Sequence, residues 1–365
     1  MTPRDRISPR QFVAAVFLSA VSLLVRRFPH ALVARAGRGA MVAVPLSILP
    51  ILAVVAAAVL LFRNHPAGSG LSDVFTGILG PAAGRILTGI YGLWFICYAG
   101  FLLRSGAERF LTTVYTGAHP WVFLIIMTLL CAPAAAGRVL PLARSSMLVR
   151  PLMLTLILGI ALLTLKDIDP ALLMPLRTTD LRADVDAALE IANLLSILVF
   201  FGFLGDRLER PLRVRDYAPW LAALLAVIGL MTAGCLGMFG AELTAKMRYP
   251  YFMLVRDLTV LGALERIEPV VIAMWVFSDF ILISLLLQLA AANLRTCLGF
   301  RPERAHRRIL PLLCTAAAAA AAFSLPGSLD AQRALSERIV PLFCAIFGFG
   351  PILPLLAVGA LRKKL

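Results

Sequence analysis

Apolar residues occur in ten long stretches that fill most of the chain, and polar residues lie mainly in the short segments between them. The hydrocarbon core of a bilayer takes about 20 apolar residues in helical form. We therefore expect an all-α membrane protein with ten transmembrane helices in a single polytopic domain, residues 1–365. The predicted helices are 11–25, 39–62, 84–115, 120–137, 146–165, 189–204, 218–241, 269–294, 309–325 and 339–361.

The two shortest stretches, 11–25 and 189–204, hold equivalent positions if the chain consists of two halves of five helices. Paired short or interrupted helices are the best sequence indication of a transporter-type binding site. Because 120–137 and 309–325 are also rather short, the pattern suggests such a site without singling it out.

Composition and charge agree with a membrane protein and argue against nucleic-acid binding. Hydrophobic residues make up 60% of the chain, against about half in a soluble domain. The net charge of +15 comes from Lys and Arg in short loops, where the positive-inside rule accounts for them. The densest basic loops then place both termini in the cytoplasm, and the first helix is expected to be retained and not cleaved as a signal peptide.

No motif for catalysis, metal binding or disulfide formation stands out. The six cysteines form no CxxC pair, and the sequence contains no HExxH, P-loop or GxSxG motif. Free thiols in apolar helices behave as small hydrophobic residues. We therefore expect no enzyme activity, no metal site and no cofactor.

Charged residues inside predicted helices are the first candidates for function, because they are costly in a bilayer. Arg104 and Glu108 are four residues apart and can pair on one helix face. Asp279 lies about ten residues inside its helix, where a carboxylate needs a partner, a proton or water. It is either a site or ion-path residue or a paired structural group. Arg26 and Arg27 either line a water-filled vestibule or mark an early end of the first helix.

Small hydroxylic residues occur in both of the shortest helices, with Ser19 and Ser22 in the first and Asn193 and Ser196 in the sixth. Such residues allow a helix to open, and the freed N–H and C=O groups can then hold a zwitterion. Ordinary helix packing is the alternative explanation.

Three segments outside this pattern carry structural expectations. Residues 65–84 predict a short interfacial helix capped near Ser72 and Asp73 and stopped at Gly80-Pro81. Residues 242–268 predict an external lid with short helices. Seven consecutive alanines at 316–322 predict close helix packing.

The stretch 249–300 resembles the permease-like B subunit of spore nutrient-germinant receptors (the GerAB-type spore permease family). The matching residues are Tyr249, Pro250, Arg256, Glu265, Arg266, Glu268 and Trp275. The start of the chain and its centre also resemble this family, through Gln11, Pro29 and Gly37 and through His119, Pro120, Trp121, Arg138 and Arg144. The resemblance extends over essentially the whole chain.

The resemblance implies the amino acid–polyamine–organocation transporter fold: inverted five-helix repeats (LeuT/APC-like) with broken helices 1 and 6. It implies a nutrient sensor in the spore inner membrane, acting with a germinant receptor A subunit and a lipoprotein C subunit, possible ion release on germination, and contact with membrane lipid. An amino acid or similar small nutrient would bind between helices 1, 3, 6 and 8. The expected ligand-binding residues are Ser19, Ser22, Tyr98, Ser196, Leu198, Asp279 and Ile281. The residues expected to brace the lid are Glu265, Arg266 and Glu268.

The chain departs from the family at three places. Ser22, Leu23 and Leu24 stand where glycines are expected at the helix-1 break, Phe280–Leu282 replace hydroxylic residues in helix 8, and Gly39 replaces the aspartate of a Gly-Arg-Asp sequence. Two other functions therefore stay open. One is a proton- or sodium-coupled secondary transporter of amino acids or amines, because fold does not settle function. The other is a scaffolding subunit with an inactive pocket.

Overall fold

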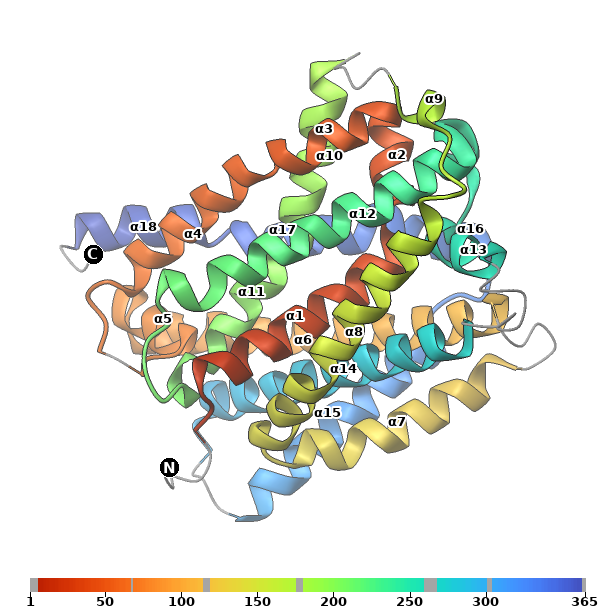
Figure 1. The fold of residues 1–365 in the computed structure, drawn as a ribbon. Helices are drawn as coiled ribbons and strands as arrows, with labels where there is room; N and C mark the ends of the chain where they lie inside the picture. Colours follow the sequence, from red (N-terminus) through yellow and green to blue (C-terminus); the bar gives the residue numbers. More distant parts are fainter. Residues whose placement is uncertain are drawn as a thin grey trace.

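The computed structural model describes residues 6–66, 68–113, 119–174, 180–258, 268–300 and 304–362. Within these ranges the protein is built from helices (Figure 1), and the β structure there consists of an isolated bridge between Ile7 and Leu208. Among the residues that the structure describes, eight helical segments are long and apolar enough to cross a membrane, and two further apolar helices, Pro120–Ala136 and Arg308–Ser324, are shorter. Each of the ten predicted stretches falls on one of these segments. The all-α architecture of a membrane protein is confirmed.

The first half of the chain contains the first five predicted helices and several short ones. Its elements are α1 (Pro9–Arg27), α2 (His30–Ala36), the 3-10 turn η2 (Gly37–Gly39), α3 (Ala40–Leu46), α4 (Ile48–Phe62), α5 (Leu71–Leu79), α6 (Pro81–Thr113), α7 (Pro120–Ala136) and α8 (Val139–Thr164). The predicted interfacial helix is α5. The Asp73 carboxylate accepts the Gly70 backbone N–H at 2.8 Å at its start, and Gly80, at φ 95°, ends it before Pro81.

The second half contains the last five predicted helices and further short elements. Its elements are α9 (Pro170–Leu173), α10 (Leu181–Leu194), α11 (Ser196–Phe201), the 3-10 segment η3 (Gly202–Arg207), α12 (Val214–Lys246), α13 (Pro250–Asp257), α14 (Glu268–Leu298), α15 (Arg304–Ser324), α16 (Leu329–Ala334), the π-helical segment η4 (Leu335–Ile339), α17 (Val340–Phe349) and α18 (Ile352–Leu361). Several helices exceed the predicted stretches because their ends carry polar residues that the apolar pattern does not register. The helix α13 lies in the predicted lid, whereas Glu265 and Arg266 lie outside the described residues.

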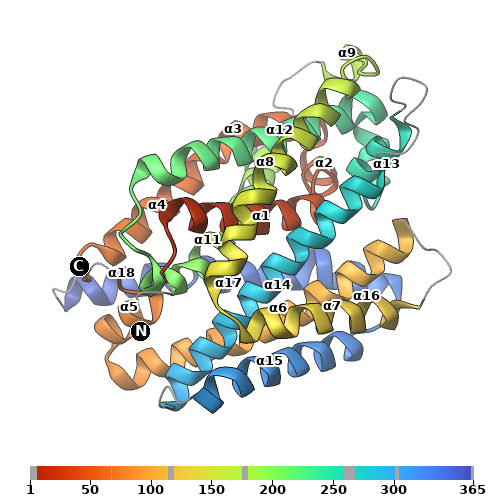
Figure 2. The same cartoon turned by 60° about the horizontal axis from the view of Figure 1, so that its bottom comes forward.

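Helix α1 runs through the centre of the bundle. Every residue from Phe12 to Val25 is buried, and the helix packs against α8, α12 and α14 (Figures 1 and 2). Its start is fixed by a capping box, in which the side chains of Ser8 and Gln11 each accept the other's backbone N–H. The helix continues to Arg27 without interruption. The expected opening at Ser22–Leu24 is therefore absent, because bulky apolar residues there keep their helical hydrogen bonds, and the chain leaves the helix at Phe28 and Pro29.

The alanine run in α15 packs closely against α6, as predicted. A Cβ atom on Gly100 would lie 2.7 Å from the carbonyl oxygen of Ala318 and 3.0 Å from Cβ of Ala321. Small residues on both helices thus allow the two backbones to approach each other.

The described ends of the chain meet at one end of the bundle. The backbone N–H of Ile7 donates to the carbonyl oxygen of Arg207 at 2.9 Å. The Arg362 guanidinium donates to the carbonyl oxygen of Ile78 at 2.8 Å, and α5 packs against both η3 and α18. Both described ends therefore lie on the same side of the helix bundle (Figure 1).

Candidate functional site

A buried charge cluster joins α1, α6 and α14 around Asp279. This residue is 1% exposed. One carboxylate oxygen accepts the hydroxyl of Ser22, and the other contacts the guanidinium groups of Arg109 and Arg26, the latter at 3.0 Å. The sequence left open whether Asp279 is a site or ion-path residue or a buried, neutral or paired structural group. In the structure its carboxylate contacts two guanidinium groups, and its role in ligand binding or ion transfer stays a prediction.

The two arginines of this cluster have further contacts. The Arg109 guanidinium lies 5.0 Å from the centre of the Trp275 ring, at a distance typical of a cation–π interaction. Arg26 donates to the carbonyl oxygen of Leu102 at 3.3 Å. Two cations thus share one buried carboxylate, so that the cluster keeps an excess of positive charge.

Arg26 also lines a cavity of about 860 Å³ at the C-terminal end of α1, which we call the vestibule. Its walls come from α1, α2, α6, α10, α11, α13, α16, η4 and α17. The charged side chains that line it are Arg26, Arg27, Arg35, Arg248, Arg333, Arg338, Glu190 and Glu337. From the sequence, Arg26 and Arg27 were expected either to line a vestibule or to mark an early end of the first helix. In the structure they line the vestibule, and α1 ends at Arg27.

Ion pairs tie the elements of the vestibule wall together. Glu190 of α10 contacts Arg27 of α1 at 2.5 Å and Arg35 of α2 at 3.2 Å. Arg27 also donates to the carbonyl oxygen of Ser336 in η4 at 2.9 Å. A π-helical turn leaves irregular backbone groups and is frequent at functional sites. The end of α1 is thereby connected to both α10 and η4.

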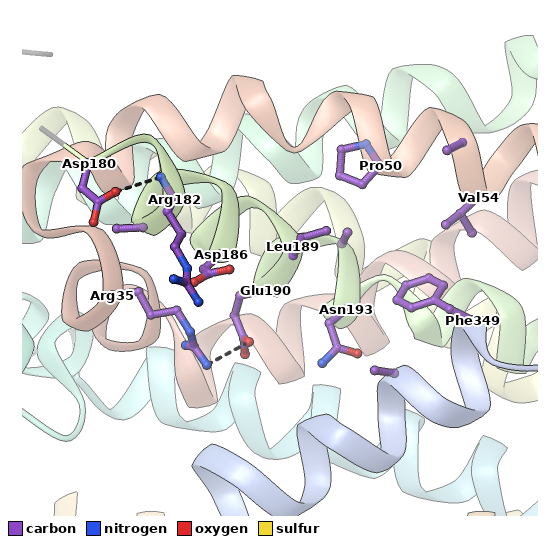
Figure 3. A pocket seen from close by; sticks show the side chains of 14 residues that line it. Arg35, Pro50, Val54, Asp180, Arg182, Asp186, Leu189, Glu190, Asn193 and Phe349 are labelled. Atoms are coloured by element: carbon purple, nitrogen blue, oxygen red, sulfur yellow. Dashed lines mark hydrogen bonds and ion pairs between the residues drawn. The ribbon is translucent and has the colours of Figure 1, made fainter. Parts of the chain in front are cut away.

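A groove of about 880 Å³ lies on the other side of this wall. Figure 3 shows Glu190 and Asn193 projecting from α10, with Arg35 reaching Glu190 from α2. These three residues line both the groove and the vestibule. The Glu190 ion pairs therefore form part of the partition between the two spaces.

Tyr98 and Ser196 meet on the vestibule wall, although they are far apart in the sequence. Both residues line the vestibule together with Cys344, and α11, which carries Ser196, packs against α17, which carries Cys344. Tyr98 stacks on Trp94 with ring centres 5.4 Å apart. Near this point the sixth predicted helix is divided at Leu195 into α10 and α11, and Asn193 donates to the carbonyl oxygen of Pro341 at 2.9 Å.

The other expected site residues lie elsewhere. Ser19 is buried and its hydroxyl has no partner among the described residues. Leu198 lines a separate apolar cavity of about 350 Å³ beside the N-terminal half of α1. Ile281 is fully buried in the core, and Glu268 begins α14. Tyr98 and Ser196 thus line the vestibule, whereas Ser22 and Asp279 lie behind Arg26.

Sequence reasoning found the intrahelical pair of Arg104 and Glu108, whose atoms lie 2.7 Å apart. It did not identify Arg109 as the partner of Asp279, nor Glu190 as the partner of Arg27. The sequence shows that each buried charge needs a partner of opposite charge. It does not show which of several charged residues is that partner.

One structural observation and two comparisons with known proteins bear on what this arrangement does. Within the described part of the chain, no group of three or more His, Cys, Asp or Glu side chains is placed to hold a metal ion. A search of curated proteins finds no match. The family model for spore germination proteins matches residues 6–325. Members of this family are integral membrane proteins of the permease type and are not a known class of enzyme. The chain therefore belongs to the spore germination protein family.

Proposed function

We propose that this protein is the permease-like B subunit of a spore nutrient-germinant receptor and that it binds a small nutrient, such as an amino acid, in the vestibule. The observation that carries the proposal is that Tyr98, Ser196 and Cys344 line the same cavity as Arg26, which contacts Asp279. Polar groups that converge in one cavity are typical of a small-molecule site.

The proposed fold is the ten-helix transporter architecture with two inverted five-helix repeats. Two features support it. The first predicted helix is central and ends inside the bundle at Arg27, and the sixth is divided at Leu195. Both breaks border the vestibule, as do the half-helices in transporters of this type. In this chain the first break lies beyond Arg27 and not at Ser22–Leu24.

The proposed signal passes from the vestibule to the surrounding helices. A ligand that contacts Arg27 competes with Glu190 of α10 and with the carbonyl oxygen of Ser336 in η4. A ligand shifts a conformational equilibrium only if it binds one conformation more tightly than the other. Replacement of the contacts that Arg27 makes with Glu190 and Ser336 would provide such a difference in affinity. The receptor A subunit and the lipoprotein C subunit would receive the change in the spore inner membrane, with both termini of this chain in the cytoplasm.

Deletion of the gene tests this function. We expect spores of the source organism that lack it to lose dipicolinic acid release in response to particular amino acids or sugars, and complementation to restore the response. Unchanged release with every nutrient, in a strain without related receptors, would contradict the proposal.

The apolar cavity beside Leu198 favours one alternative, a proton- or sodium-coupled secondary transporter of amino acids or amines. This cavity borders the N-terminal half of α1, at Phe12–Ala20, whereas the vestibule borders its C-terminal end at Leu23–Phe28. In alternating access one site opens to each side of the membrane in turn, and a cavity at each end of a central helix is compatible with such a path. Uptake of labelled amino acids into proteoliposomes, driven by an ion gradient, would identify a transporter, whereas a sensor needs no turnover.

A further inference from the structure

We propose that the groove between α4, α10 and α17 is a binding site for one membrane phospholipid whose headgroup carries a primary ammonium group, as in phosphatidylethanolamine. The inference does not rest on the proposed function, because the groove lies on the other side of the Glu190 wall from the vestibule. Three observations carry it. The groove faces the bilayer, its charged and apolar ends are separate, and its charged end has unpaired groups of both signs.

The groove borders the lipid-facing surface of the bundle. Leu52 of α4 and Leu189 of α10 are 55% and 50% exposed, and Leu189 lines the groove itself. Exposed leucines of a membrane-spanning chain face acyl chains, which are as apolar as the leucine side chain. The groove follows one face of α10 from Asp180 to Asn193, a rise of roughly 20 Å. A phospholipid spans half of a bilayer that is about 40–45 Å thick, so that one molecule fits this length.

The two ends of the groove differ in chemistry. Figure 3 shows Arg182 and Asp186 at one end and Val54 and Phe349 at the other. Ala53, which precedes Val54, also lines the apolar end, and its small side chain leaves room for an acyl chain beside α4. The groove is therefore complementary to a molecule with a charged head and an apolar tail.

The charged end carries groups of both signs, and two of them are unpaired. Arg35 and Arg182 line it together with Asp180, Asp186 and Glu190, which gives 2 − 3 = −1. Glu190 contacts Arg35 at 3.2 Å. The Arg182 guanidinium and the Asp186 carboxylate, both on exposed residues, form no ion pair among the described residues. Charged side chains are costly at a surface that faces lipid, and a headgroup that bonds to both of them removes that cost.

These charges favour an ammonium-bearing phospholipid over other lipids. A guanidinium group binds phosphate oxygens through parallel hydrogen bonds, which suits Arg35 and Arg182. A primary ammonium group has three N–H donors for a carboxylate such as that of Asp186. A choline headgroup has no N–H donor, and a glycerol headgroup has no cation for the surplus carboxylate. An ethanolamine headgroup satisfies the groups of both signs.

Native mass spectrometry of the purified full-length protein tests the site. Delipidated protein in detergent would be titrated with dioleoyl phosphatidylethanolamine, phosphatidylcholine or phosphatidylglycerol, and the fraction that carries one bound lipid would be measured. Loss of a charge-assisted hydrogen bond weakens binding by about tenfold. We therefore expect the first phosphatidylethanolamine to bind roughly tenfold more tightly than either of the other two lipids.

Variants assign the preference to the groove. Arg182→Gln and Asp186→Asn should each reduce the preference for phosphatidylethanolamine, and because both residues are exposed the fold should be retained. Ala53→Phe fills the apolar end from an exposed position and should weaken binding of phosphatidylethanolamine. Arg63→Gln and Asp257→Asn remove the same charges from exposed positions outside the groove and should retain the wild-type preference.

Three results would overturn the proposal. Equal binding of the three lipids, or an unchanged preference in Arg182→Gln and Asp186→Asn, would show that the groove selects no headgroup, and would leave a helix of a partner subunit as its occupant. Tightest binding of phosphatidylglycerol would show that the arginines alone select the lipid. Nutrient binding in the vestibule is unaffected by each of these results.

Discussion

The carboxylate of Asp184 occupies the space beside Gly39 in which a side chain at position 39 would lie. A Cβ atom built on Gly39 would overlap the carboxylate of Asp184, which reaches across from α10 to η2. Asp184 is fully buried, and neither of its carboxylate oxygens has a hydrogen-bond partner among the described residues. The family resemblance implies an aspartate at position 39, and in this chain an acidic group reaches the same place from the facing helix.

This relationship predicts that Gly39→Ala destabilises the protein by about 1–3 kcal/mol, because an added methyl group in a packed core forces its neighbours to move. The measurement is thermal unfolding of the purified protein in detergent. In an Asp184→Ala background the obstructing carboxylate is absent, so that Gly39→Ala should cost much less. An equal cost in both backgrounds would show that the overlap is not the cause.

The buried cluster predicts that Asp279→Asn is strongly destabilising. Loss of the shared charge leaves Arg26 and Arg109 buried without an anion, and removal of one partner from a buried ion pair typically costs about 3–5 kcal/mol. We expect lower accumulation in the membrane fraction and a lower midpoint of thermal unfolding. Asp257→Asn, at an exposed position at the end of α13, is the matched control and should accumulate normally. Wild-type stability of Asp279→Asn would contradict the ion-pair geometry.

The contact between α6 and α15 predicts that Gly100→Ala destabilises the bundle by roughly 1–3 kcal/mol. The added Cβ would lie 2.7 Å from a backbone oxygen of Ala318, and a backbone atom moves only if the helix moves. Gly159→Ala in α8 is the control, because a Cβ there meets no atom within 4 Å. Comparison of the two unfolding midpoints in detergent provides the measurement, and similar midpoints would argue against close packing at Gly100.

The charge of the vestibule predicts how fast a cysteine at its wall is modified. Ser336 lines the vestibule, and its backbone oxygen accepts from Arg27. After Ser336→Cys, in a background with the exposed Cys97 and the vestibule-lining Cys344 changed to Ser, a negatively charged thiol reagent should react roughly tenfold faster than a positively charged one. High salt should reduce this ratio by screening. A ratio below one at low salt would contradict a cationic vestibule.

The hydroxyl group of Ser196 on the vestibule wall predicts a moderate contribution to nutrient affinity. Ser196→Ala removes one polar group from the wall of the cavity, and a single hydrogen bond to a ligand contributes about 0.5–1.5 kcal/mol. We expect a several-fold loss of nutrient affinity by calorimetry, with the protein still folded. Ser145→Ala in α8, where the hydroxyl only returns to its own helix at Pro141, should leave affinity unchanged.

Much of the fold could be predicted because it depends on local sequence. The helical segments follow from runs of apolar residues, and α5 follows from Asp73 and Gly80, whose effects are confined to one helix end. The pair of Arg104 and Glu108 follows from four-residue spacing on one helix. The expected opening of α1 at Ser22–Leu24 failed, because the surrounding helices bury these residues and hold them in regular helix.

The sequence by itself determined that the protein is a helical membrane protein, that Asp279 needs a partner and that Arg26 and Arg27 stand at an unusual place. Only the tertiary structure decided which charges meet: Ser22 is 257 residues from Asp279 and Arg109 is 170 residues from it. The same holds for Tyr98, Ser196 and Cys344, which three separate helices bring to one wall. Helix packing fixes these pairings. Each buried charge has several candidate partners in the sequence, and only a partner that lies beside it in the folded protein lowers the free-energy cost of burying it.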